Sequence, residues 1–234
     1  MIVLILALDT STAACSAALR QNGSTVSKSI DYIERGHAEV LIPMIEKMMK
    51  KTGHDPKAIE LIAVTIGPGA FTGLRVGLAT ARGISLATGA PCIGLTSTET
   101  LAAALVKDEL NESILAVITS KRTDIYSQAF KANNVPISEP SALALEKLSD
   151  YYKAYCCTDN YFTLVGDAQG IVAPHLIEAG WKVKKSSIIF PDAETLAGLA
   201  EARWKPDTCH LPPTPLYLRP ADAIIPKNGG RLRS

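Results

Sequence analysis

The sequence lacks the residue patterns of several common classes of enzyme and metal protein. Its four histidines lie far apart and show neither HxxxH nor HExxH spacing, so we expect no helical zinc or iron site. No GxSxG motif occurs, which argues against the hydrolases that carry their nucleophile on that turn. The five cysteines show no paired metal spacing, and their odd number is typical of reduced thiols in the cytosol.

The sequence also lacks an excess of one charge and a long apolar run. Lysine and arginine number 24 and aspartate and glutamate 23, so tight binding of nucleic acid by this chain alone is not favoured. The first apolar run ends at Asp9, too early for a signal peptide or a membrane span. We therefore expect a cytoplasmic protein with no membrane contact, and 234 residues suffice for one large or two smaller domains.

A strand followed by a glycine turn is the most distinctive local pattern. The apolar run Leu61–Ile66 predicts a buried strand, and Gly67 and Gly69 follow it on either side of Pro68. Such a turn before a helix can hold a phosphate on the helix amides. The Walker spacing of glycine, lysine and serine or threonine is absent, so the phosphate signal is weak.

The helix expected after this turn, Gly73–Thr88 with Thr72 as N-cap, is small or apolar on nearly every side. Each interior glycine costs roughly 1 kcal/mol relative to alanine, which close backbone contact would offset. One side is expected to pack on its own sheet and another on a second helix, from this chain or from a partner. An ordinary, tightly packed core helix is the alternative. The small residues form two ridges: Gly73, Gly77, Ala81 and Ser85, and Ala79, Gly83 and Ala87.

An earlier helix is expected over His37–Lys51, with Pro43 near its start, where a missing N–H is tolerated. Methionines on one face of a helix suit adaptable core packing, and they also suit a groove for a partner. Both interpretations stay open. The apolar face consists of Val40, Leu41, Met44, Ile45, Met48 and Met49.

A polar turn is expected where the first strand, Ile2–Leu8, ends at Asp9, Thr10 and Ser11. In actin-like ATPases this geometry places an aspartate near Mg²⁺ and hydroxyls near phosphate. The alternative is a polar strand end in which Asp9 binds backbone amides. A site of this kind needs a second acidic loop, after the first strand of the second half. Here that strand runs into Ser120, and no carboxylate stands at the start of the turn.

The remaining pattern predicts two halves that each begin with strands. Asn22-Gly23 indicates a hairpin between two early strands, and the charged segment 107–113 is the expected domain boundary. A helix is predicted over Ala142–Leu148, and Asp192 is expected to cap another that ends near Trp204.

Several motifs together resemble the bacterial TsaB (YeaZ) family of the actin-like (ASKHA) superfamily. They are the initial LALDTST, then HAEVLIPMI, IGPGAFTGLRVG and the late PLYLRP. The resemblance implies an α/β fold of two actin-like, ribonuclease H-like domains with mixed sheets flanked by helices. The domains would be residues 1–108 and 109–234, with about 205–225 returning to the first.

The resemblance also implies a function. It points to a non-catalytic scaffold or activator that pairs with a TsaD-type transferase, which makes N6-threonylcarbamoyladenosine beside the tRNA anticodon. A TsaE-type ATPase would join the complex, the chain alone would form a homodimer, and tRNA would be reached only through the complex. No catalytic residues, metal or resident cofactor are expected, although ATP or ADP with Mg²⁺ could bind weakly at the subunit junction. The Ser120 position, usually an aspartate in the family, weakens nucleotide chemistry further.

The resemblance assigns residues to two features. Asp9, Thr10, Ser11, Gly67 and Gly69 would form a vestigial phosphate loop, and an actin-like ATPase or phosphotransferase built on it is the alternative function. Direct tRNA binding through Arg75, Arg82 and the basic tail is a third reading, which the near-neutral charge disfavours. The partner face would lie on the first two helices, at Val40, Pro43, Met44, Lys47, Met48, Gly73, Val76, Gly77, Thr80, Gly83 and Ile84.

Overall fold

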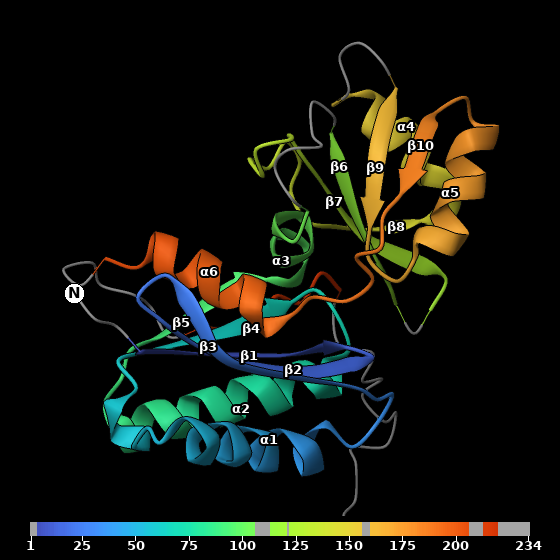
Figure 1. Ribbon diagram of the computed structural model, residues 1–234. Helices are drawn as coiled ribbons and strands as arrows, with labels where there is room; N and C mark the ends of the chain where they lie inside the picture. Colours follow the sequence, from blue (N-terminus) through green and yellow to red (C-terminus); the bar gives the residue numbers. More distant parts are fainter. Residues whose placement is uncertain (1–3, 106–112, 121, 156–159, 206–212, 220–234) are drawn as a thin grey trace, which may run out of the picture.

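The computed structural model describes residues 4–105, 113–120, 122–155, 160–205 and 213–219. In these residues the chain forms two units, each built on a five-stranded mixed sheet (Figure 1). This is the predicted fold class. Within the described parts of the chain, no helix combines the length and the hydrophobicity needed to cross a membrane. The basic tail and most of the expected boundary segment lie outside the described residues.

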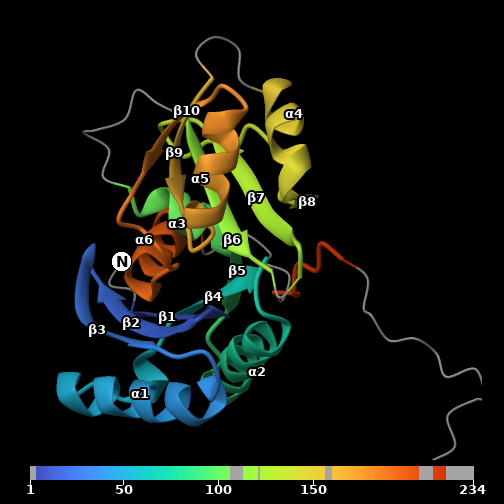
Figure 2. The same ribbon diagram turned by 90° about the vertical axis from the view of Figure 1, so that its right-hand side faces the viewer.

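The first sheet has the order β3-β2-β1-β4-β5. The first three strands form an antiparallel meander, and β4 and β5 add in parallel to β1. Helices α1 and α2 cover one face of this sheet, and α6 covers the other (Figures 1 and 2). The strands are β1 (Leu4–Thr12), β2 (Ala14–Gln21), β3 (Ser24–Tyr32), β4 (Leu61–Gly67) and β5 (Cys92–Thr96); the helices are α1 (His37–Thr52), the short 3-10 turn η1 (Pro56–Ala58), α2 (Phe71–Thr88) and α6 (Ala193–Arg203).

The second sheet, β10-β9-β6-β7-β8, repeats this topology, with an antiparallel trio followed by two parallel strands. Helices α4 and α5 lie on one of its faces, and α3 sits between the two units (Figure 1). The elements are α3 (Ser97–Ala103), β6 (Ile114–Thr119), β7 (Asp124–Phe130), β8 (Ser141–Ala144), η3 (Leu145–Lys147), α4 (Leu148–Lys153), β9 (Tyr161–Val165), α5 (Gln169–Glu178) and β10 (Lys182–Lys185).

Strand β1 is apolar at every position up to Leu8 because both of its faces are covered. Leu6 and Leu8 pack with the core residues of α1 and α2, whereas Ile5 and Ala7 pack with α6. A strand buried on two sides gains no advantage from alternating polarity. This double coverage makes the carboxyl end of β1 a buried position, which matters for the polar residues that follow.

The boundary of the second domain differs from the expected one. Residues 109–234 were assigned to the second domain, but α6 packs on the first sheet through Leu196, Ala197 and Ala200. The segment 213–219 also lies on the first unit, where the Leu216 amide donates to the Ile66 carbonyl oxygen at 2.7 Å. The return of 213–219 falls within the expected segment of about 205–225, whereas the packing of α6 on the first sheet was not expected.

Some local predictions were wrong. The polar turn expected from Asp9 belongs to β1, which runs to Thr12 with a register shift. Helix α2 begins at Phe71 with Ala70 as N-cap, so Thr72 is inside the helix and does not cap it. The helix predicted over Ala142–Leu148 is instead strand β8 followed by a 3-10 turn.

Two further elements were not predicted. Strand β10 carries three lysines among four residues, and α4 follows the 3-10 turn η3. Both depend on neighbours in the second sheet: β10 pairs with β9, and Leu148 of α4 is fully buried in the core. Tertiary packing therefore outweighs weak local propensity in this part of the chain.

Candidate functional site

The Asp9 carboxylate is fully buried at the carboxyl end of the first sheet. Its Oδ1 accepts hydrogen bonds from the hydroxyls of Thr65 at 2.6 Å and Ser11 at 2.7 Å, and from the Ser11 amide at 3.3 Å. Its Oδ2 has no hydrogen-bond partner among the described residues. Burial raises the pKa of Asp9 to about 6, although the bonds from Thr65 and Ser11 lower it.

The glycine turn closes directly on this strand end. The Ala70 amide donates to the Ser11 carbonyl oxygen at 2.7 Å, and the Thr10 hydroxyl donates to the Gly73 carbonyl oxygen at 2.8 Å. A Cβ atom on Gly69 or Gly73 would overlap the backbone carbonyl of Ser11 or Thr10. The structure thus brings the predicted loop residues together, but in such close contact that a phosphate between them would require the two segments to separate.

The corresponding position in the second unit is also occupied by internal hydrogen bonds. The Ser120 hydroxyl donates to the Asp124 carbonyl oxygen at 2.6 Å. Asp167, which the sequence reading did not assign to a site, accepts from the amide and the hydroxyl of Thr119 at 2.7 and 2.6 Å. Among the described residues, no three His, Cys, Asp or Glu side chains are grouped so that they could hold a metal ion.

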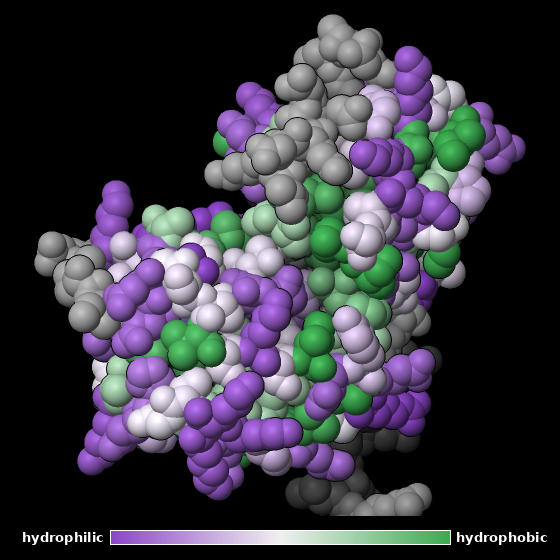
Figure 3. All heavy atoms as spheres, viewed as in Figure 1, coloured by the Kyte–Doolittle hydropathy of each residue, from purple (hydrophilic) through white to green (hydrophobic). Residues whose placement is uncertain are grey.

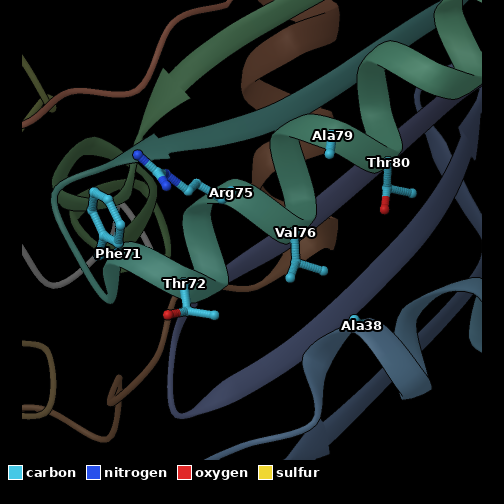
Figure 4. A pocket seen from close by; sticks show the side chains of 7 residues that line it. All are labelled: Ala38, Phe71, Thr72, Arg75, Val76, Ala79 and Thr80. Atoms are coloured by element: carbon cyan, nitrogen blue, oxygen red, sulfur yellow. The ribbon is translucent and has the colours of Figure 1, made fainter. Parts of the chain in front are cut away.

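A shallow groove of about 420 Å³ lies between the start of α1 and the outer side of α2 (Figure 4). Its residues are small or apolar except for two threonines and Arg75, the single charged residue of the lining. Figure 4 shows Phe71 at one end of the groove, with Val76 and Thr80 further along the helix. The lining consists of Ala38, Phe71, Thr72, Arg75, Val76, Ala79 and Thr80.

The groove continues onto an exposed, mostly apolar side of α2. Ala79 and Gly83 are exposed there, and the Leu86 side chain is 89% exposed. Among the described residues, no atom beyond the neighbouring residues and backbone of α2 lies within 4 Å of the position that a Cβ on Gly83 would take. Large exposed apolar side chains beside a groove are typical of a protein interaction site.

The structure sorts the residues expected at the partner face into two groups. Met44, Met48, Gly73 and Gly77 are buried in the first unit's own core, so their expected place on the partner face is wrong. Gly77 is small because Thr10 of β1 lies where its Cβ would be. The other expected residues are half-buried or exposed: Val40, Pro43, Lys47, Val76, Thr80, Gly83 and Ile84.

The helical wheel shows which sides of α2 are small but not which side faces the sheet. The first ridge, with Gly73 and Gly77, packs on β1, and the second ridge, with Ala79 and Gly83, faces outward. The first ridge therefore packs on the chain's own sheet, as expected, whereas contact of the second ridge with a partner stays a prediction.

The sequence reading missed the aromatic end of the groove. Arg75 places its guanidinium carbon 3.8 Å from the centre of the Phe71 ring, and its Nε donates to the Tyr217 hydroxyl at 3.1 Å. Arg82 donates to the Pro213 carbonyl oxygen at 2.5 Å. An aromatic residue four positions before an arginine at a helix start was a usable signal, but its link to Tyr217 required the fold. Both arginines proposed for tRNA contact are thus engaged within the chain.

A second, smaller groove of about 300 Å³ lies between β3 and the segment before α6. Figure 3 shows hydrophobic side chains gathered near the junction of the two units on this face. The Tyr32 ring is 70% exposed and packs against Phe190 with 5.7 Å between centres. The lining consists of Ile30, Tyr32, Ser187, Ile188, Ile189, Phe190 and Asp192.

Comparison with known proteins gives the family. The family model described as "TsaD: tRNA N6-adenosine threonylcarbamoyltransferase" matches residues 31–153, more than half of the chain. The chain belongs to this family. Its relatives and structural neighbours place it with the TsaB (YeaZ) type, as the motifs predicted.

Three relatives of the TsaB type illustrate the match. The Escherichia coli protein TsaB is 34% identical over 122 residues, 52% of this chain and 52% of the relative, so the chain spans about half of that protein. TsaB of Buchnera aphidicola subsp. Baizongia pistaciae is 28% identical over 86% of this chain and 90% of its own. The solved structure of YeaZ from Pseudomonas aeruginosa is 27% identical, with a TM-score of 0.76 over 92% of this chain and all of that one. Both TsaB relatives are named as tRNA threonylcarbamoyladenosine biosynthesis proteins.

Proposed function

We propose that the chain is a non-catalytic scaffold and activator subunit in the formation of N6-threonylcarbamoyladenosine in tRNA. It would pair with a TsaD-type transferase through the groove between α1 and α2. The observation that carries this proposal is the outward ridge of α2, where Ala79 and Gly83 leave room for a second backbone beside an apolar groove.

The chemistry of the groove suits a helix of another subunit. Small residues let two helix backbones approach closely, and flanking apolar side chains supply buried area. The exposed Leu86 and Phe71 mark the two ends of α2 and would gain the most from being covered. Arg75, at the Phe71 end, favours a carboxylate on the partner helix.

A catalytic role is disfavoured by the contact between the Asp9 strand end and the glycine turn. Gly69 and Gly73 lie directly against the backbone carbonyls of Ser11 and Thr10, and the Ala70 amide is already bound to Ser11. We therefore propose that this loop is structural in the isolated chain and that any nucleotide binds at the junction with the partner. Calorimetric titration of the isolated chain with ATP and Mg²⁺ tests this, because saturable binding would favour the ATPase or phosphotransferase alternative.

The same proposal includes three associations. A homodimer in the absence of the transferase would use the α1–α2 groove, a TsaE-type ATPase would join the heteromeric complex, and tRNA would bind only to that complex. The chain's net charge of +1 supports the last point, because phosphate contacts by this subunit alone would be few.

The substitution Ala79→Arg tests the interface. It places a long charged side chain in the groove at an exposed position, so the fold should be kept while the Kd for a TsaD-type protein rises by at least about tenfold. The measurement is sedimentation velocity with the purified partner. The matched control is Ile171→Arg on α5 of the second unit, where the replaced side chain is 52% exposed. If Ala79→Arg and Ile171→Arg bind the TsaD-type protein equally well, the partner does not use the α1–α2 groove. If the unchanged chain does not bind it, the pairing itself is refuted.

A further inference from the structure

The segment 213–219, here called the strap, crosses the first unit far from its own place in the sequence (Figure 2, red). The Leu216 amide donates a hydrogen bond of 2.7 Å to the carbonyl oxygen of Ile66, near the end of β4. Arg82, on the second half of α2, donates to the Pro213 carbonyl oxygen at 2.5 Å. Both contacts use backbone atoms of the strap, so they fix its path across β4 and α2.

Two glycines make room for the strap. A Cβ on Gly94 of β5 would come within 2.8 Å of the Pro213 Cβ, besides overlapping the Ile66 side chain, and a Cβ on Gly67 would come within 3.0 Å of the Leu216 carbonyl oxygen. Pro213 is buried in the resulting contact. Positions at which a Cβ would meet the strap show that it lies close against the body of the unit.

The strap reaches the groove through Tyr217. Its ring centre lies 5.2 Å from that of Phe71, and its hydroxyl accepts the hydrogen bond from Arg75. Phe71 and Arg75 both line the groove, and they stack on each other. The Tyr217 side chain therefore holds two groove residues that would otherwise be free to change rotamer at the exposed start of α2.

The strap continues to the second unit. Arg219 forms an ion pair with Asp124 at the start of β7, and the Asp124 side chain is only 14% exposed. One short segment thus contacts β4, α2 and β7 in succession.

We propose that the strap fixes the first two turns of α2, and with them the Phe71–Arg75 end of the groove, and ties this end to the second unit. Fixing these side chains before association reduces the conformational entropy that a partner must remove on binding. Strap docking and partner binding at the groove are then coupled, and each stabilises the other. This second statement rests on the proposed function, whereas the first concerns the isolated chain alone.

Hydrogen exchange of the isolated chain tests the proposal directly. Tyr217→Ala removes the ring and the hydroxyl, and we expect exchange at residues 71–76 to become at least about tenfold faster. Tyr217→Phe keeps the ring contact with Phe71 and loses the bond to Arg75. Its exchange rate at residues 71–76 should therefore lie between those of the unchanged chain and of Tyr217→Ala. The matched control is Tyr32→Ala, which removes an exposed ring of the second groove. Equal exchange at residues 71–76 in the unchanged chain and in Tyr217→Ala would overturn the proposal.

The link to the second unit is tested by a charge swap. Arg219→Asp should speed exchange at residues 71–76 and at the start of β7, and Asp124→Arg added to it should restore the slow rate. Failure of the double variant to restore protection, with circular dichroism unchanged, would remove this part of the proposal.

Binding to a TsaD-type protein separates this inference from the proposed function. If Tyr217→Ala raises the Kd by about tenfold or more while Tyr32→Ala leaves it unchanged, the coupling holds. If faster exchange leaves the Kd unchanged, the strap orders α2 without acting on the partner, and the coupling is refuted. If the unchanged chain does not bind, the proposed function fails, and the exchange experiment still decides whether the strap orders α2.

Discussion

At the scale of single residues, Asp9 combines full burial with an incomplete set of hydrogen bonds. Thr65 and Ser11 satisfy Oδ1, and Oδ2 has no partner among the described residues. Loss of hydration destabilises the ionised carboxylate relative to the protonated carboxyl, and this raises the pKa of Asp9 to about 6. The buried Asp9 carboxylate therefore lowers the stability of this fold near neutral pH.

The first prediction concerns the folding free energy that is lost when the buried Asp9 carboxyl ionises. Because the pKa of Asp9 is higher in the folded chain than the ordinary value of 3.8 for an exposed aspartate, folding stability should fall as pH rises from about 4 to 6. Asp9→Asn removes this titration and should lessen the fall by roughly 2–3 kcal/mol. Urea unfolding of both proteins between pH 4 and 7.5 measures it, with Asp31→Asn on the exposed part of β3 as control. The same pH dependence in the unchanged chain and in Asp9→Asn would contradict the assignment.

At the scale of one element, the two ridges of small residues on α2 lie in different surroundings. A Cβ on Gly77 would meet Thr10 of β1, whereas a Cβ on Gly83 would meet no atom outside α2 within 4 Å in the part of the chain that the structure describes. The presence of glycine therefore has a different physical reason at each of these two positions, six residues apart in one helix. One permits packing within the chain, and the other leaves a surface flat.

A pair of substitutions distinguishes these two reasons. Gly77→Leu should reduce the free energy of unfolding by about 3 kcal/mol or more, because its Cβ overlaps the Thr10 hydroxyl. Gly83→Leu should leave stability unchanged or raise it by up to about 1 kcal/mol, since leucine has the better helix propensity. Thermal unfolding measures the stabilities, and sedimentation measures the pairing.

Only the Gly83 variant then reports on pairing, which the added leucine should weaken while the chain stays folded. Full pairing by a folded Gly83→Leu chain would place the partner on a different side of α2.

At the scale of the whole molecule, the chain repeats one topology twice and then returns to its first unit. The second sheet has the same strand pattern as the first, and the segment after it supplies α6 to the first sheet. Arg20 of β2 and Glu201 of α6 form an ion pair at 2.7 Å that connects distant parts of the sequence. Stability of the first unit therefore depends on residues near the end of the chain.

The last prediction compares two fully buried leucines. Leu196→Ala on α6 should destabilise the first unit by about 2–5 kcal/mol, although its sequence position is in the second half. Leu176→Ala on α5 is the matched substitution in the second unit. Hydrogen exchange should show loss of protection in β1 for the first variant and in β9 for the second. Loss of protection in β9 alone for both would contradict the placement of α6.

Much of the architecture was predictable from local pattern. The apolar run before Asp9, the Asn22-Gly23 hairpin and the alternation of strands and helices indicated two halves that each begin with strands, because periodicity and turn chemistry depend on nearby residues. The family resemblance added the expectation of two mixed sheets. The wrong helix over Ala142–Leu148 and the missed β10 are short segments whose conformation is set by the neighbouring strands of their sheet.

The candidate site was only partly predictable. The resemblance grouped Asp9 with the glycine turn, and the residue pattern indicated that α2 is too apolar to have a single buried side. It could not show that Met44 and Met48 belong to the core, because a helical pattern gives a face without its neighbour.

The sequence by itself determined the family motifs, the order of the longer strands and helices, and the presence of small residues on two sides of α2. The tertiary structure alone decided which of those sides stays open, that the Asp9 turn is closed, and that Tyr217 reaches Phe71. The physical reason is that hydrophobic periodicity acts over a few residues, whereas the strap and α6 depend on contacts between residues more than a hundred positions apart.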